Sequence, residues 1–159
     1  MRQVEEMPLK ILIVAVVLSS TLPYIADALR GYSEESTLSY LEGELNQFIT
    51  AAQTVYRVGV GSVRVVTLSV RSPGVVSVER IAIGGDFEEE RKYLPVIRVK
   101  LVGEPEKFLV TEPNVPMTTS EGGFSPLNLQ EGEWKIRLEH KVAVVRGVSM
   151  HYVDLTLLS

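Results

Sequence analysis

The sequence predicts an α+β protein, in which a long, kinked, hydrophobic N-terminal α-helix precedes a head domain built as an antiparallel β-sandwich or small barrel. Three patterns predict this fold class. Residues 11–26 carry no charge, residues 38–55 repeat apolar side chains at helical spacing, and later segments alternate apolar with polar residues. We therefore expect a helical part over residues 1–57 and a β-rich globular head over residues 58–159.

The composition fits one domain and argues against several classes of protein. The chain has 159 residues, of which 45% are hydrophobic, enough for one core. Its formal net charge is −4, so it lacks the positive field that attracts nucleic acid, and we expect no nucleic-acid partner. It contains no cysteine, which excludes disulfides, thiolate metal sites and cysteine nucleophiles.

The uncharged run at residues 11–26 can dock in a bilayer but is short for a permanent anchor. It makes roughly 24 Å of helix, against about 30 Å of hydrocarbon. A cleaved signal peptide is one interpretation, because Ala26 and Ala28 match a cleavage pattern, although the preceding charges are of mixed sign. A buried helix of a soluble protein would carry a polar stripe, which residues 11–18 lack. A segment for a membrane or a filament core is the favoured interpretation.

Two features are expected to interrupt this helix. Pro23 lacks a backbone N–H and predicts a kink around residues 19–23. Gly31 and Ser33 form a second weak point, with Ser33 or Ser36 as a possible N-cap of the following helix. That helix, over residues 33–57, is amphipathic. Its apolar seam, spaced three and four residues apart, is predicted to dock on the head: Leu38, Leu41, Leu45, Phe48, Ala52 and Val55.

The remainder reads as strands joined by turns. Residues 66–70 alternate, and the turn at residues 72–74 is expected to need a positive φ at Gly74. Alternation slips at Glu79 and Arg80, which predicts a β-bulge.

Three later strands are predicted at residues 96–102, 134–142 and 148–158, with a shorter one at 107–111. Arg98 should face solvent, and Arg146 with Gly147 should form the last turn. Residues 112–131 should be a surface loop.

No constellation of catalytic residues stands out, and we expect neither an enzyme nor a bound cofactor. His140 and His151 sit in strand patterns rather than at metal-ligand spacing. The acidic run at residues 88–90, with Asp86, could hold calcium loosely but is more typical of a solvated loop.

The N-terminal pattern resembles a known family. Glu at the fifth position, an apolar helix with a proline within it, an amphipathic continuation and a β-rich head together resemble an archaeal type IV pilin. The runs EEMPLKILI at residues 5–13, GSVRVVTL at residues 61–68 and IAIGG at residues 81–85 are also similar to archaeal proteins with pilin-type N-termini.

This resemblance implies a subunit of an extracellular cell-surface filament, inserted in the cytoplasmic membrane before assembly. It implies a homo-oligomer of helical symmetry whose core, residues 1–30, is built from bundled helices. It also implies a prepilin peptidase and an assembly machinery as partners, with a new amine at Met1 that Glu5 of a neighbouring subunit would neutralise. The residues implied in assembly are Met1, Glu5, Ile11, Leu12, Val14, Val17, Leu18 and Pro23.

Two alternatives stay open at this point. Met1 could be an ordinary initiator, with Glu5 and Glu6 in solvent and Lys10 paired with Glu6 one helical turn away. The chain could also be a membrane-anchored surface module that grips a partner, such as a surface layer, with its β-domain.

Overall fold

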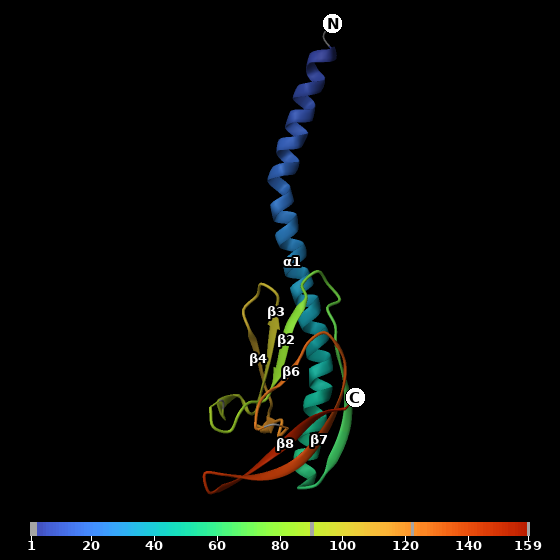
Figure 1. Ribbon diagram of the computed structural model, residues 1–159. Helices are drawn as coiled ribbons and strands as arrows, with labels where there is room; N and C mark the ends of the chain where they lie inside the picture. The colour runs from blue at the N-terminus through green and yellow to red at the C-terminus, as the bar shows by residue number, and fades with distance from the viewer. Residues whose placement is uncertain (1–2, 90, 122, 159) are drawn as a thin grey trace.

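The computed structural model describes residues 3–89, 91–121 and 123–158, with side chains described from Lys10 onward (Figure 1). Within these ranges the chain is an α+β protein, with one long N-terminal helix followed by two mostly antiparallel sheets. The helix is α1 (Gln3–Val58), and a short 3-10 turn, η1 (Arg91–Tyr93), connects two strands. The strands are β1 (Val63–Val70), β2 (Val78–Ile83), β3 (Val96–Leu101), β4 (Lys107–Val110), β5 (Met117–Thr118), β6 (Leu127–Leu129), β7 (Gly132–Val145) and β8 (Val148–Leu158).

Each sheet contains four of these strands. The first has the order β1-β7-β8-β5 and the second the order β4-β3-β2-β6. All pairings between the strands are antiparallel except that of β5 with β8, which is parallel. One apolar core joins α1 to both sheets, and its members from the three layers include Phe48, Ile136 and Ile97. The C-terminal half of α1 packs along the head while the N-terminal half projects beyond it (Figure 1).

α1 is continuous, which differs from the expected two-part helix. Residues 19–23 are helical, so the kink predicted at Pro23 is not confirmed. The hydroxyl groups of Ser19 and Thr21 donate to the carbonyl oxygens of Ala15 and Val17, at 2.7 Å and 2.9 Å, within the same helix. The prediction that Ser33 or Ser36 caps a new helix is wrong, because the backbone stays helical to Val58.

Several strand features agree with the sequence. The register between β2 and β3 shifts between Val78 and Arg80, which confirms the bulge. Arg146 and Gly147 both have positive φ, 50° and 79°, and join β7 to β8 in a two-residue turn. This turn matches the natural twist of the paired strands.

Three expectations about the head are wrong. Gly74 does not have a positive φ; it is needed because a Cβ there would clash with the side chain of Ser33. Arg98 is buried, with its guanidinium carbon 4.4 Å from the centroid of the Tyr93 ring. The segment at residues 112–131 is not only a surface loop, because it contributes β5 and β6 and buries Met117 and Leu129 in the core.

Candidate functional site

The most unusual surface of the molecule is the projecting part of α1, which we call the bare segment and define as residues 10–29. Every large apolar side chain from Ile11 to Leu29 is at least 53% exposed. The predicted assembly residues Ile11, Leu12, Val14, Val17, Leu18 and Pro23 all lie on this segment and are exposed. Because isolated apolar side chains on a surface are ordinary but a whole apolar rod is not, this surface calls for an apolar partner.

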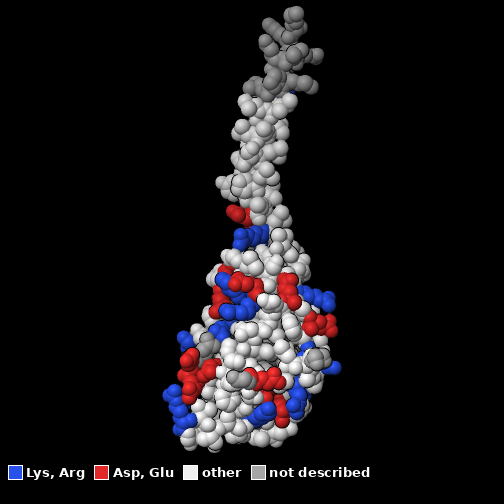
Figure 2. Space-filling model, viewed as in Figure 1, with Lys and Arg blue, Asp and Glu red and all other residues white. Residues whose placement is uncertain are grey.

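The bare segment has the chemistry of a helix that enters an apolar medium. It carries no charge between residues 11 and 26, and Figure 2 shows an uncharged shaft above the charged head. The aliphatic hydroxyl groups of Ser19, Ser20 and Thr21 are satisfied inside the helix; Ser20, for example, donates to the carbonyl of Val17 at 2.9 Å.

By length and composition, the helix from Lys10 onward can cross a membrane. Signal sequences and the core helices of soluble proteins meet the same criteria, but the apolar window here is not buried by the rest of the chain. An N-terminal helix of this kind can span a membrane or act as a signal.

Two predicted assembly residues cannot be placed by their side chains. Met1 lies outside the described residues, and Glu5 lies within α1 at a position whose side chain is not described. The pairing of Glu5 with a neighbouring amine therefore remains a prediction from the resemblance.

The other half of α1, residues 33–57, is the docked segment. The predicted seam residues line the contact with the sheets: Leu41, Leu45, Phe48, Ala52 and Val55 are buried, and Leu38 is partly buried against the same core. Ala51 is buried as well, although the sequence analysis did not include it. Thr37, on the same segment, is also fully buried, so the buried face is wider than the apolar spacing alone indicates.

Polar contacts bind the N-terminal end of the docked segment, and the turn before it, to the head. The side chain of Ser33, which is buried, accepts a hydrogen bond from the backbone N–H of Val76 at 2.9 Å. Arg30 forms an ion pair with Glu104 at 2.9 Å. One turn further, Glu34 pairs with Lys107 at 2.7 Å. We call these two ion pairs the collar, because they mark the boundary between the bare and docked segments.

An apolar notch opens just beside the collar. It has a volume of about 440 Å³ and lies between α1, at Ala26 and Leu29, and the loop tips that carry Val75 and Val102. Val75 is 86% exposed, so the apolar surface of the bare segment continues onto the head. Sequence analysis missed these loop valines, because isolated valines next to turns carry no periodic signal.

The two histidines, which the sequence places in strand patterns, face one another. His140 Nε2 lies 3.0 Å from His151 Nδ1 across the β7–β8 pair, and the His140 ring stacks on Tyr56 near the C-terminus of α1. Burial of the His140 ring, together with the neighbouring His151, lowers the pKa of His140 below its ordinary value. The alternating pattern predicted that each histidine lies in a strand. It did not predict the register of β7 against β8 that brings the two rings together.

A buried ion pair lies on the same hairpin. Asp154 is almost fully buried and accepts a hydrogen bond from Lys141 at 2.5 Å and another from the backbone N–H of Ser120 at 2.9 Å. This hydrogen bond with Asp154 raises the pKa of the Lys141 amine. Burial raises the pKa of the nearby Tyr152 phenol. These contacts tie the segment before β6 to the hairpin, which is a structural role.

The acidic loop offers no preformed metal site among the residues described. Asp86 accepts hydrogen bonds from the backbone N–H groups of Glu88 and Glu89, so its carboxylate shapes the turn. Within the described ranges, no group of three or more His, Asp or Glu side chains is arranged to hold a metal ion, and Glu90 lies outside them.

Comparisons with models of protein families, with curated proteins and with solved structures found no match to this chain. Its function must therefore be argued from the bare segment and the head themselves.

Proposed function

We propose that this protein is a structural subunit of a type IV pilus-like filament on the cell surface, in which the bare segments of many copies bundle into the core. The observation that carries the proposal is the exposure of the whole apolar rod from Ile11 to Leu29 in a chain whose head is otherwise well packed. A rod of this kind is stable only when another apolar surface covers it.

The magnitude of the hydrophobic effect supports assembly. If each helix buried on the order of 1,000 Å² of apolar surface, the gross stabilisation would be about 25 kcal/mol before entropy losses. Several neighbours around each helix would share this surface. The hydroxyl groups of Ser19, Ser20 and Thr21 suit such a bundle, because each donates to a carbonyl oxygen of the same helix.

The head would then form the outside of the filament. In this proposal the two sheets make a sandwich-like domain that is held rigidly to the rod, because the same helix serves both parts. A kink near Pro23 would form only in the assembled state, where neighbouring subunits could bend the helix. The protein would be inserted in the cytoplasmic membrane before assembly and would carry out no catalysis.

Filaments recovered from the surface of the source cells would test this proposal. We expect electron cryo-microscopy to show a helical polymer of this chain with an α-helical core. Glu5→Ala should reduce the yield of filaments and leave the head folded, whereas Glu121→Ala, an exposed acid on the head, should leave the yield unchanged. A chain found only as dispersed monomers in the membrane would contradict the proposal.

A second candidate, a membrane-anchored surface module, is favoured by two tyrosines near the end of the bare segment that adjoins the head. Tyr24 and Tyr32 are both highly exposed and lie where the helix leaves its uncharged stretch, as in the aromatic belt of a membrane interface. This candidate predicts that the protein is extracted from cells by detergent and never sediments as a polymer. The filament proposal predicts detergent-resistant polymers.

A further inference from the structure

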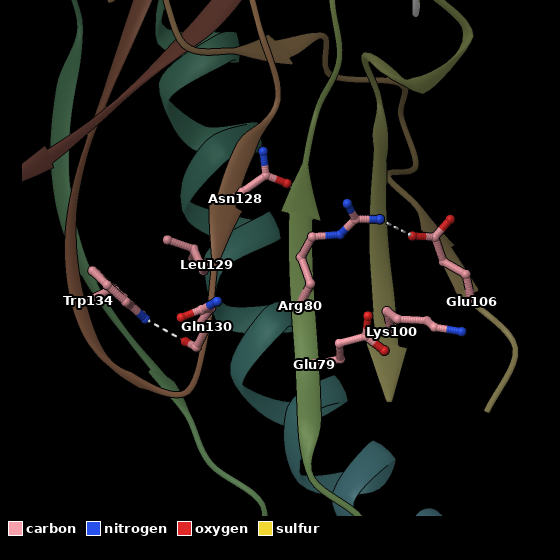
Figure 3. Close-up of a pocket in the computed structure, with 8 residues that line it drawn as sticks. All are labelled: Glu79, Arg80, Lys100, Glu106, Asn128, Leu129, Gln130 and Trp134. Carbon is pink, nitrogen blue, oxygen red and sulfur yellow. Dashed lines mark hydrogen bonds and ion pairs between the residues drawn. The ribbon is translucent and has the colours of Figure 1, made fainter. Parts of the chain in front are cut away.

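The head carries a polar groove that crosses the outer face of the sheet β4-β3-β2-β6 and reaches the edge of the core at Leu129 and Trp134 (Figure 3). Its volume is about 630 Å³, within the range of small-molecule binding sites. Side chains from β2 and β3 line one side, and the segment from β6 to the start of β7 lines the other (Figure 3). The groove is independent of the bare segment and has no part in the proposed assembly.

The bulge in β2 builds one side of this groove. In a regular strand, two successive side chains point to opposite faces. Here Glu79 and Arg80 are both exposed between the buried Val78 and Ile81, because the register shift places an extra residue on the outer face. The bulge thus delivers a carboxylate and a guanidinium group to one groove.

The two basic side chains of the groove already bind other groups of the protein. Arg80 pairs with Glu106 at 3.1 Å, and Lys100 Nζ donates to the backbone carbonyl of Glu104 at 2.6 Å. Two basic and two acidic side chains line the groove, so it has no net formal charge. A phosphate or another anion would have to displace these contacts, so a neutral ligand fits better.

The opposite side offers a fixed aromatic ring. Trp134 is half-buried at the edge of the core, and its Nε1 donates to the backbone carbonyl of Gln130 at 2.8 Å (Figure 3). Gly132 lies against the indole, since a Cβ at that glycine would approach the ring to 3.4 Å. The ring is therefore held in place before any ligand arrives, which lowers the entropy cost of binding.

Uncommitted polar atoms surround the indole. Among the described residues, the side chains of Glu79 and Gln130 make no hydrogen bond or ion pair, and Asn128 uses only its amide nitrogen, which donates to Pro126. The Glu79 carboxylate accepts hydrogen bonds, and the amides of Asn128 and Gln130 both donate and accept them. They match a ligand with many hydroxyl groups and no charge.

We propose that this groove binds a neutral carbohydrate, as a short oligosaccharide. One sugar ring would place its apolar C–H surface near the Trp134 indole, and its hydroxyl groups would bond to Glu79, Asn128 and Gln130. The proposal goes beyond the filament function and does not depend on it, because the groove belongs to the folded head alone.

The chain contains a single tryptophan, so its fluorescence reports directly on the groove. The full chain, kept in a detergent without a sugar headgroup, would be titrated with maltotriose, cellotriose, mannotriose and chitotriose. We expect at least one of these to give a saturable change in tryptophan emission. Asn128→Ala and Gln130→Ala should each weaken that binding by about three- to tenfold.

Matched controls separate binding from general effects. Asn114→Ala, which removes an exposed amide elsewhere on the head, should leave the affinity unchanged. Trp134→Phe removes the reporter, so its affinity would be measured by calorimetry, and it should fall by about tenfold. No saturable change with any of the four sugars would overturn the proposal. So would undiminished binding in an Asn128→Ala, Gln130→Ala double variant, or tighter binding of inorganic phosphate than of the sugars.

Discussion

The two halves of α1 are one continuous helix, yet they meet opposite surroundings. In the docked segment, Leu45 and Ala52 are completely buried against two sheets. In the bare segment, Leu18 is 53% exposed, and the N-terminal part of α1 projects beyond the head (Figure 1). The backbone is the same in both halves, so the difference lies in what covers the side chains. The apolar side chains of the docked half are buried by the same chain. Those of the bare half can be buried only by another molecule.

The largest effect should come from removing a large side chain in the docked segment. Phe48→Ala should lower the free energy of unfolding of the head by about 3–5 kcal/mol, because it leaves a cavity in the shared core. Leu18→Ala in the bare segment should change it by less than about 0.5 kcal/mol. Chemical denaturation of the full chain in detergent would measure both. Equal effects would remove the distinction between the two halves.

A smaller effect is expected where docking begins, and two glycines give a matched pair. Gly74→Ala should destabilise the head by about 1–3 kcal/mol, because its Cβ would push Ser33 away and break the bond to Val76. Gly43→Ala, in the middle of α1 with open space around it, should stabilise the protein by up to about 1 kcal/mol. Thermal unfolding would measure the stability of both variants. If both substitutions changed the stability in the same direction, the result would contradict the contact between Ser33 and the loop.

The far end of the docked segment should respond to pH. The pKa of His140 is lowered in the folded state, chiefly by burial and also by His151, so the unfolded state binds its proton more readily. Stability should be full above about pH 6.5 and should fall as the pH drops below that value. The backbone carbonyls of Val55, Tyr56 and Gly59 face the ring and partly offset this effect.

Melting temperatures measured above and below pH 6.5 would test the prediction. We expect His140→Gln to reduce the change of melting temperature with pH. His151→Gln should weaken the dependence without abolishing it. A curve that His140→Gln leaves unchanged would assign the pH response to other groups.

The smallest effect is expected at the collar. Lys107→Gln should lower the free energy of unfolding by at most about 1 kcal/mol, because the ion pair of Lys107 with Glu34 is partly exposed to water. The loss should shrink further at high salt, since salt screens exposed charges. Unfolding measured at low and high ionic strength would show this, with Lys107→Arg as the control that keeps the charge. A large loss of stability that does not depend on salt would contradict this prediction, because it would mean that the ion pairs of the collar supply most of the stability of the docked segment.

The sequence predicted the parts of the fold that repeat. Spacing of three and four residues identified the seam from Leu38 to Val55, and a break in the alternation identified the bulge at Glu79 and Arg80. Both signals are local, because they depend on which face of one element is buried. The turn at Arg146 and Gly147 is equally local.

The parts that were missed depend on contacts between distant segments. The hydroxyl of Ser33 accepts a hydrogen bond from the backbone N–H of Val76, far away in the sequence, instead of capping a new helix. Gly74 is required by Ser33, far away in the sequence, rather than by its own turn. Met117 and Leu129 lie in a stretch rich in turn residues, yet they pair with other strands and enter the core. No single-segment pattern contains this information.

The central claim is that copies of the same chain cover the bare segment, rather than lipid or the chain's own head. A photo-crosslinking benzophenone amino acid at Leu18 would identify the neighbour of that position directly, in material recovered from the cell surface. The filament account predicts covalent chain-to-chain adducts at Leu18 and none from the same group placed at the exposed head position Glu121. Adducts with lipid alone, or only within one chain, would contradict it.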